Sequence, residues 1–184
     1  ICGHSDAMLG TVSANAATFG LLRDTVHALG LCVGPDDIYL GLRGLRTMGV
    51  RLAAHYQAGL KIAQWLAARP EVARVLHPAF DTCPGHAVWK RDFTGASGLF
   101  GVVLKEGVSD GALAAMIDGL ELYGIGSSWG GYESLIVPFS PREVRTATPW
   151  QAKGPCFRIH AGLENIDDLI EDLDAGFGRL RAAL

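Results

Sequence analysis

The sequence predicts an α/β protein in two parts, a helical part up to about residue 70 and then a smaller part in which strands and helices alternate. Three observations support this prediction. Apolar residues recur at helical spacing over 16–29 and 38–66. After Pro70, short apolar runs alternate with helical patterns, as in a small α/β or α+β domain. With 184 residues, of which 49% are hydrophobic and 19% charged, the chain can bury a core.

Helical patterns dominate the first part. Residues 3–13 mix glycines with apolar side chains and predict a strand or turn, and the helix over 16–29 ends at Gly30. A second, long helix starts after Gly34-Pro35-Asp36-Asp37 and continues until Pro70 ends it. On this helix, a solvated basic stretch or a subunit contact would explain the cluster of Arg43, Arg46 and Arg51.

The second part predicts three strands and three helices. Two helix starts carry capping residues, Ser109 and Asn165. Residues 77–85 and 138–155 lack a period and are expected to be loops, the second of them long and exposed. The expected strands are 72–76, 99–104 and 157–161, and the expected helices are 87–93, 111–120 and 166–180.

Charge and composition exclude several classes of partner. A net charge of −3, from 16 Lys and Arg against 19 Asp and Glu, gives no basic surface for nucleic acid or anionic lipid. The apolar run from Leu99 to Leu104 stops at Lys105, far short of the roughly 20 residues of a membrane span. We therefore expect a soluble protein with small-molecule or protein partners. Four cysteines without paired spacing predict reduced thiols in the cytoplasm and no metal site.

The stretch Ser127 to Ser134 is unusual for its composition. It combines hydroxyls, the indole of Trp129 and the pair Gly130-Gly131 between two apolar runs. Such residues suit the wall of a cleft, because glycine admits close backbone approach and Trp provides a large flat face. The alternative is a strand that leads into a glycine turn with a packed Trp, and these eight residues by themselves favour that alternative.

Arg158 is the strongest single candidate for a binding residue. Strand alternation places Phe157, Ile159 and Ala161 on one face, and Arg158 with His160 on the other. A guanidinium on an otherwise apolar strand matches a carboxylate, which it can bind through two hydrogen bonds. An internal salt bridge to one of the acidic residues is an equally good explanation.

Other candidate motifs are weak. The run His4-Ser5-Asp6 contains the residue types of a hydrolase triad, but adjacency in sequence does not give the required geometry. No phosphate-binding glycine motif occurs. Four histidines without ligand spacing are expected on the surface or on helix faces: His27, His55, His77 and His86.

Five segments together resemble the pyridoxal-phosphate-dependent Cys/Met metabolism family, along the whole chain and in the family's order. They are Gly3 to Gly10, Arg43 to Thr47, Trp89 to Gly95, Ser128 to Ser134 and Arg158 to Glu164. The resemblance implies the C-terminal half of a fold-type I, aminotransferase-like α/β enzyme. Residues 1–70 would finish the large cofactor domain and its connecting helix, and residues 71–184 would form the small C-terminal domain.

The same resemblance assigns roles to particular residues. Arg158 would hold the substrate α-carboxylate, Ser128 would help position the catalytic lysine and the substrate, and Trp129 would line the amino-acid pocket. The Schiff-base lysine would lie just upstream of Ile1, and no residue of this chain would bind the cofactor. None of the chain's lysines stands in the family's lysine motif: Lys61, Lys90, Lys105 and Lys153.

The resemblance also implies a reaction. Trp129 points to the cystathionine β-lyase branch, which uses pyridoxal 5′-phosphate to cleave L-cystathionine to homocysteine, pyruvate and ammonia in methionine biosynthesis and trans-sulfuration. Ser127 departs from that branch's larger aromatic residue. The alternatives are γ-lyase or γ-synthase chemistry, or a non-catalytic binding domain. The implied partners are the N-terminal half of the same protein and further subunits of a cytoplasmic homotetramer.

Overall fold

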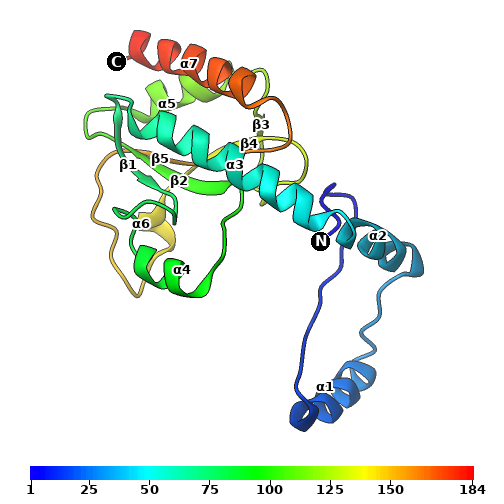
Figure 1. The fold of residues 1–184 in the computed structure, drawn as a ribbon. Helices are drawn as coiled ribbons and strands as arrows, with labels where there is room; N and C mark the ends of the chain where they lie inside the picture. Colours follow the sequence, from blue (N-terminus) through cyan, green and yellow to red (C-terminus); the bar gives the residue numbers. More distant parts are fainter. The chain divides into compact units, whose positions relative to one another are not determined.

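The computed structural model describes residues 1–184, which form two compact units, 1–49 and 50–184 (Figure 1). The sequence-based division near residue 70 stays a prediction. None of the helices combines the length and the apolar composition that crossing a bilayer requires.

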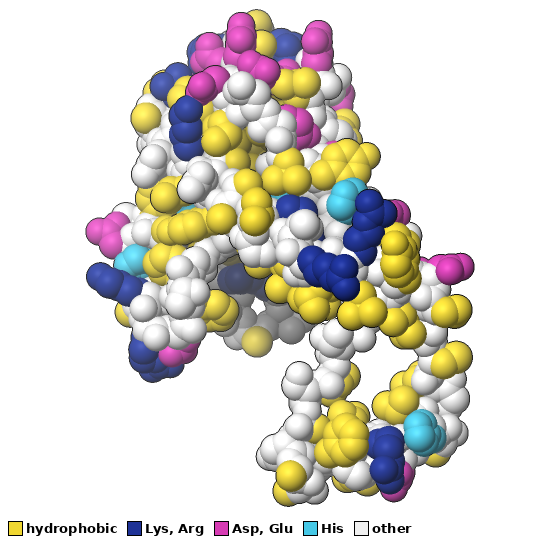
Figure 2. All heavy atoms as spheres, turned by 45° about the vertical axis from the view of Figure 1, so that its right-hand side comes forward, with side chains coloured by type: hydrophobic (Ala, Val, Ile, Leu, Met, Phe, Trp, Pro, Cys, Tyr) yellow, Lys and Arg dark blue, Asp and Glu magenta, His cyan; other side chains and the backbone are white.

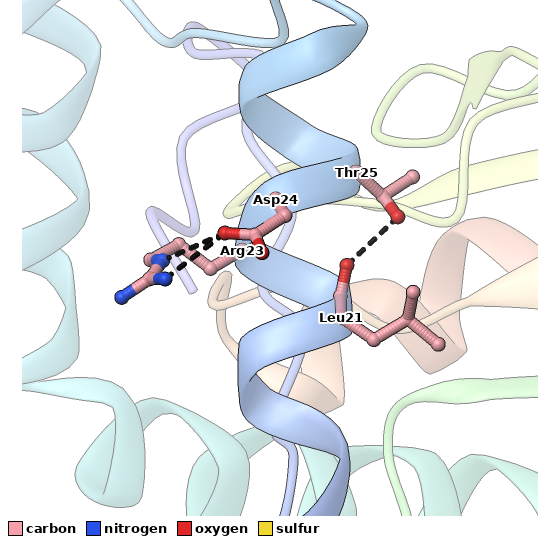
Figure 3. A network of polar contacts seen from close by, with 4 residues as sticks. All are labelled: Leu21, Arg23, Asp24 and Thr25. Carbon is pink, nitrogen blue, oxygen red and sulfur yellow. Dashed lines mark hydrogen bonds and ion pairs between the residues drawn. The ribbon is translucent and has the colours of Figure 1, made fainter.

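The unit of residues 1–49 contains two helices, α1 (Ala16–Ala28) and α2 (Pro35–Leu45). Asn15 caps α1 by accepting a hydrogen bond from the Thr18 backbone N–H, 3.1 Å away. Polar contacts along α1 are local, as Figure 3 shows: Arg23 binds its neighbour Asp24, and Thr25 donates to the Leu21 carbonyl. No residue of α1 is buried, and Figure 2 shows hydrophobic side chains exposed over this unit.

The prediction of one long helix up to Pro70 is wrong, because the chain breaks it into α2 and α3 (Met48–Ala67). At the break the Thr47 N–H bonds back to the Gly44 carbonyl at 3.1 Å, which closes a turn. Gly44 packs against the backbone of Ile1 and Cys2, where a Cβ would approach the Ile1 carbonyl oxygen to 2.6 Å. The apolar period runs through the turn unchanged, so periodicity does not reveal it.

A five-stranded sheet forms the centre of the 50–184 unit, in the order β1-β2-β5-β4-β3. All neighbouring pairs are antiparallel except β3 with β4, which are parallel. The strands are β1 (Val72–Leu76), β2 (Leu99–Leu104), β3 (Gly124–Ile125), β4 (Leu135–Phe139) and β5 (Cys156–His160).

Three helices, α3, α5 (Asp110–Ile117) and α7 (Ile166–Ala182), cover one face of this sheet (Figure 1). Their apolar sides enclose the core with Phe157 and Ile159 of β5, both without exposed surface. The short helices α4 (His86–Asp92) and α6 (Pro141–Val144) lie on the other side of the sheet (Figure 1). The core therefore lies on one side of β5, and residues of that strand pointing the other way are available for a site.

Most expected elements after Pro70 are confirmed to within one or two residues. Ser109 and Asn165 do cap α5 and α7, because each side chain accepts from a backbone N–H in the first turn. Four details differ. Strands β3 and β4 were not among the expected strands, residues 3–13 form no strand, α5 ends at Ile117, and the expected loop 138–155 contains the end of β4 and all of α6.

Candidate functional site

Arg158 lies in the middle of β5, the central strand, paired with Gly101 of β2 on one side and Val137 of β4 on the other. Its neighbours Phe157 and Ile159 point into the core, and Arg158 points to the opposite face, where it is half-buried. The predicted alternation is therefore confirmed. Because β5 has a strand on both sides, the position of the Arg158 Cα is fixed by two hydrogen-bonded ladders.

Two backbone carbonyls orient the Arg158 guanidinium. Its Nη2 donates to the carbonyl oxygen of Ser127 at 2.5 Å and to that of Ser128 at 2.8 Å. No carboxylate lies within ion-pair distance, so the alternative of an internal salt bridge is wrong. Carbonyls aim the side chain but leave its positive charge uncompensated. The remaining N–H groups can therefore receive a ligand carboxylate.

The segment 127–134 is an irregular turn that lies over the end of β5. Gly130 has φ +91° and its Cα rests on the His160 ring, so any Cβ there would collide with the imidazole. The Gly130 N–H donates to the Ser128 hydroxyl at 3.2 Å. Trp129 is 78% exposed, so the interpretation as a strand with a packed Trp is wrong. An indole held out on a glycine turn is free to form one wall of a pocket.

The residues after Arg158 hold the rest of this segment. His160 donates from Nε2 to the Gly131 carbonyl at 3.1 Å, and the Leu163 N–H donates to the Tyr132 carbonyl at 2.8 Å. Glu164 accepts from both the N–H and the hydroxyl of Ser134, at 2.7 and 2.8 Å. Ser127 to Ser134 is thus attached at five residues to β5 and to the loop that follows it.

His160 is buried and forms a pair with His55 of α3. The ring centroids are 5.0 Å apart, and His55 Nδ1 donates to the Ala161 carbonyl at 2.9 Å. Burial lowers the pKa of His160 below its ordinary value, although its hydrogen bond to Gly131 opposes the shift. His160 is therefore neutral near pH 7, with the proton on Nε2 as the bond to Gly131 requires.

The expectation of surface or helix-face histidines is wrong for His77. It has no exposed surface and packs against the rings of Tyr56, Phe80 and Phe100. Burial lowers its pKa. His55 does lie on a helix face, but that face is buried. Spacing rules detect metal ligands, and they do not detect a histidine that serves as an aromatic core residue.

No lysine accompanies Arg158. Lys61 pairs with Asp167 and Lys153 with Glu106, and none of the four lysines bonds to Arg158 or to residues 127–134. No cluster of His, Cys, Asp or Glu side chains could hold a metal ion. Within this chain the site can orient a carboxylate and offer an aromatic wall.

Comparison with known proteins identifies the family of the chain that carries this site. Residues 1–178 match the family described as Cys/Met metabolism PLP-dependent enzyme. The chain belongs to this family. Cystathionine β-lyase MetC of Escherichia coli strain K12 is 48% identical over 183 residues, which cover 98% of this chain and 46% of that protein. The L-alanine/L-glutamate racemase of Wolbachia pipientis wMel is 38% identical, over 98% of this chain and 45% of the relative.

A solved structure confirms the fold. The crystal structure of cystathionine γ-synthase from Xanthomonas oryzae pv. oryzae, in complex with cystathionine, superposes with a TM-score of 0.86 at 34% identity. It is matched over all of this chain and 48% of that one. The chain thus spans about half the length of these relatives and has the fold of the C-terminal part of a fold-type I PLP enzyme.

The site contains residues that sequence reasoning missed. Alternation places His160 on the face of Arg158 without giving it a role, and Ser134 and Glu164 stand in the sequence only as parts of motifs. A signal existed for His160, because the alternation that selects Arg158 also selects it. No signal existed for the pair Ser134 and Glu164, whose contact joins residues 30 positions apart.

Proposed function

We propose that the protein to which this chain belongs is a PLP-dependent carbon–sulfur lyase. It cleaves L-cystathionine by β-elimination to homocysteine, pyruvate and ammonia, a step of trans-sulfuration in methionine biosynthesis. The observation that carries the proposal is Arg158, a guanidinium that two carbonyls aim and no carboxylate neutralises. The 48% identity to a cystathionine β-lyase, against 34% to a cystathionine γ-synthase, favours β-elimination.

Arg158 binds the α-carboxylate of the amino acid. Its charge matches that group, and the two carbonyl contacts fix the guanidinium plane before the substrate arrives, which lowers the cost of ordering it on binding. When bound, pyridoxal 5′-phosphate supplies an electron sink for the Cα carbanion. In the family resemblance, the lysine that carries the cofactor and the residues that hold its phosphate match positions outside these 184 residues, which leaves the substrate side as the role of this chain.

Ser128 and Trp129 complete the substrate side. The Ser128 carbonyl orients Arg158, and its hydroxyl, tied to the Gly130 N–H, stays close to the bound carboxylate and helps to position the catalytic lysine. Trp129 covers the side chain of the substrate and excludes water from the reacting carbon. Its indole is exposed in this chain, which fits a wall whose opposite side is provided by the cofactor.

Product analysis of the full-length enzyme with L-cystathionine tests this function. Pyruvate with homocysteine indicates β-elimination, whereas 2-oxobutyrate with cysteine indicates the γ-lyase alternative. If alanine or glutamate racemises and cystathionine is not cleaved, the lyase function is wrong and the similarity to the racemase is the better guide. A full-length protein that binds amino acids without converting any of them would support the non-catalytic alternative.

Three properties of the whole protein complete the proposal. Residues 1–70 finish the large cofactor domain, and residues 71–184 are the small domain. The enzyme is a homotetramer, a dimer of dimers, and it works in the cytoplasm. Light scattering of the full-length protein measures the assembly directly, and a mass of one or two subunits would contradict the tetramer.

A further inference from the structure

We propose that Glu164 is a positioning residue for the substrate carboxylate: through Ser134 it fixes the segment 127–134 and so keeps the Ser127 and Ser128 carbonyls on Arg158. This inference rests on the proposed function, because it assumes that Arg158 binds the amino acid. Neither the family match nor the similar proteins assign Glu164 a role.

The contacts of Glu164 form a closed network. Its Oε1 accepts from the Ser134 N–H at 2.7 Å, and its Oε2 accepts from the Ser134 hydroxyl at 2.8 Å. That hydroxyl in turn accepts from the Gly162 N–H at 2.8 Å. Ser134 is 1% exposed and Glu164 is half-buried, so these bonds are partly shielded from water. Bonds to a charged carboxylate in such a setting are stronger than bonds between neutral groups.

The network spans both sides of the site. Ser127 and Ser128, at the start of the segment, contact Arg158, and Ser134 is its last residue. Gly162 and Glu164 lie in the loop after β5, four and six residues beyond Arg158. Gly162 has no space for a side chain, since a Cβ there would collide with Glu164 and the Tyr132 carbonyl. These contacts hold Ser134, the end of the segment, in place relative to β5. The start of the same segment carries the Ser127 and Ser128 carbonyls that orient the Arg158 guanidinium.

Asp172 provides a matched control. It lies in α7, and its carboxylate accepts from the backbone N–H groups of Glu121 and Leu122 at 3.1 and 2.8 Å. Those residues lie in the connection between α5 and β3, whereas Ser134 ends the next connection, between β3 and β4. Each carboxylate thus ties a connection beside β3 to the chain that follows β5. Of the two carboxylates, only Glu164 binds a residue of the segment 127–134.

The test measures the affinity of the PLP-loaded full-length enzyme for L-cystathionine and for glycine, from the change in cofactor absorbance on titration. A guanidinium that is no longer aimed loses a well-aligned charge-assisted hydrogen bond to the carboxylate, so we expect Glu164→Ala to weaken both affinities by roughly 10- to 100-fold. Glu164→Gln should lose less affinity than Glu164→Ala, because its amide oxygen still accepts from the Ser134 N–H although the hydroxyl hydrogen of Ser134 loses its acceptor. Asp172→Ala should leave both affinities unchanged, even if it lowers thermal stability as much.

A double-mutant cycle separates positioning from general stabilisation. If Glu164 acts through Arg158, then Glu164→Ala adds no loss of affinity in an Arg158→Ala background. An additive loss, or equal effects of Glu164→Ala and Asp172→Ala, would overturn the proposal. Should Glu164→Ala not fold, Ser134→Ala removes the hydroxyl bonds alone and is expected to show the same non-additivity.

The same titration separates this inference from the proposed function. A parent enzyme that binds both amino acids but releases no pyruvate refutes the lyase function and still tests Glu164. A parent that binds neither amino acid overturns the carboxylate site, and the role of Glu164 with it.

Discussion

Two arginines of the 50–184 unit show how the partner decides the role of a guanidinium. Arg181 of α7 donates to the Glu71 carboxylate at 3.0 Å, and the Glu71 side chain is only 7% exposed. Arg158 of β5 meets two carbonyls and no carboxylate. The charges at the Arg181 site cancel, so it ties α7 to the chain before β1. The Arg158 site keeps a net positive charge and can attract an anion.

The two arginines also differ in energetic role. Removing Arg181 would leave a buried carboxylate without its partner, which costs stability. Removing Arg158 would leave only the Ser127 and Ser128 carbonyls without a partner. They lie in a partly exposed turn, where water can hydrogen-bond to them. We therefore expect substitutions at Arg181 to change the free energy of unfolding and substitutions at Arg158 to change substrate binding. Single substitutions can test this division, from the largest expected effect to the smallest.

Arg158→Ala should produce the largest change. It removes the charge-assisted hydrogen bonds to the substrate carboxylate, worth about 1.5–3 kcal/mol each, so kcat/KM should fall by roughly 100-fold or more. The loss should be carried mainly by KM, with the cofactor spectrum of the enzyme unchanged. Steady-state kinetics of the full-length enzyme measure both, and an unchanged KM would refute the carboxylate clamp. Arg181→Ala is the matched control, because kcat/KM should not respond to it.

Trp129→Ala should have an intermediate effect. The indole is 78% exposed in this chain, so truncation should leave the midpoint of denaturant unfolding unchanged. If the indole covers the substrate, the apolar surface that it shields from water is worth about 1–2 kcal/mol, or roughly a tenfold drop in kcat/KM. Trp129→Phe retains a flat ring and should recover much of the activity. A loss of stability without a loss of activity would instead indicate a structural role for this ring.

Arg181→Ala should change stability and not activity. The Glu71 carboxylate would lose its partner, but Arg181 is 48% exposed and water can partly replace it. We expect a loss of about 1 kcal/mol in the free energy of unfolding. Denaturant unfolding at pH 7 measures it. Replacing both Glu71 and Arg181 by apolar residues should recover part of the loss, whereas an equal loss in the single and double variants would show that the unpaired Glu71 carboxylate is not its cause.

Local signals explain what the sequence predicts correctly. The strands after Pro70, the caps Ser109 and Asn165, and the side of β5 that carries Arg158 all depend on residues close together in the chain. Their patterns are therefore visible in a single sequence. The break between α2 and α3 was missed because Gly44 is required by its contact with Ile1 and Cys2, more than 40 positions away, while the apolar period continues across it.

The site was predicted in part for the same reason. Alternation selects Arg158, but only the fold shows that its partners are the carbonyls of Ser127 and Ser128, about 30 positions earlier. The exposure of Trp129 depends on the positive φ of Gly130, and that glycine is required by the His160 ring beneath it. The composition of residues 127–134 by itself therefore favours a packed Trp, which tertiary contacts exclude.

Low pH should reduce the free energy of unfolding through His77, which contacts neither Arg158 nor Arg181. Burial lowers the pKa of His77, so the unfolded chain binds a proton at this residue more readily than the folded protein does. The free energy of unfolding should thus be unaffected by His77 above pH 6.5 and should fall as the pH drops below that value, the ordinary pKa of histidine. His77→Phe, which keeps the ring contacts with Tyr56, Phe80 and Phe100, should reduce this fall.

Unfolding midpoints at pH 7 and pH 5 measure the difference, and an identical fall in parent and variant would show that His77 is not among the groups responsible. Because His77 does not contact the segment 127–134, the KM of the variant at pH 7 should equal that of the parent, which separates acid stability from the carboxylate site at Arg158.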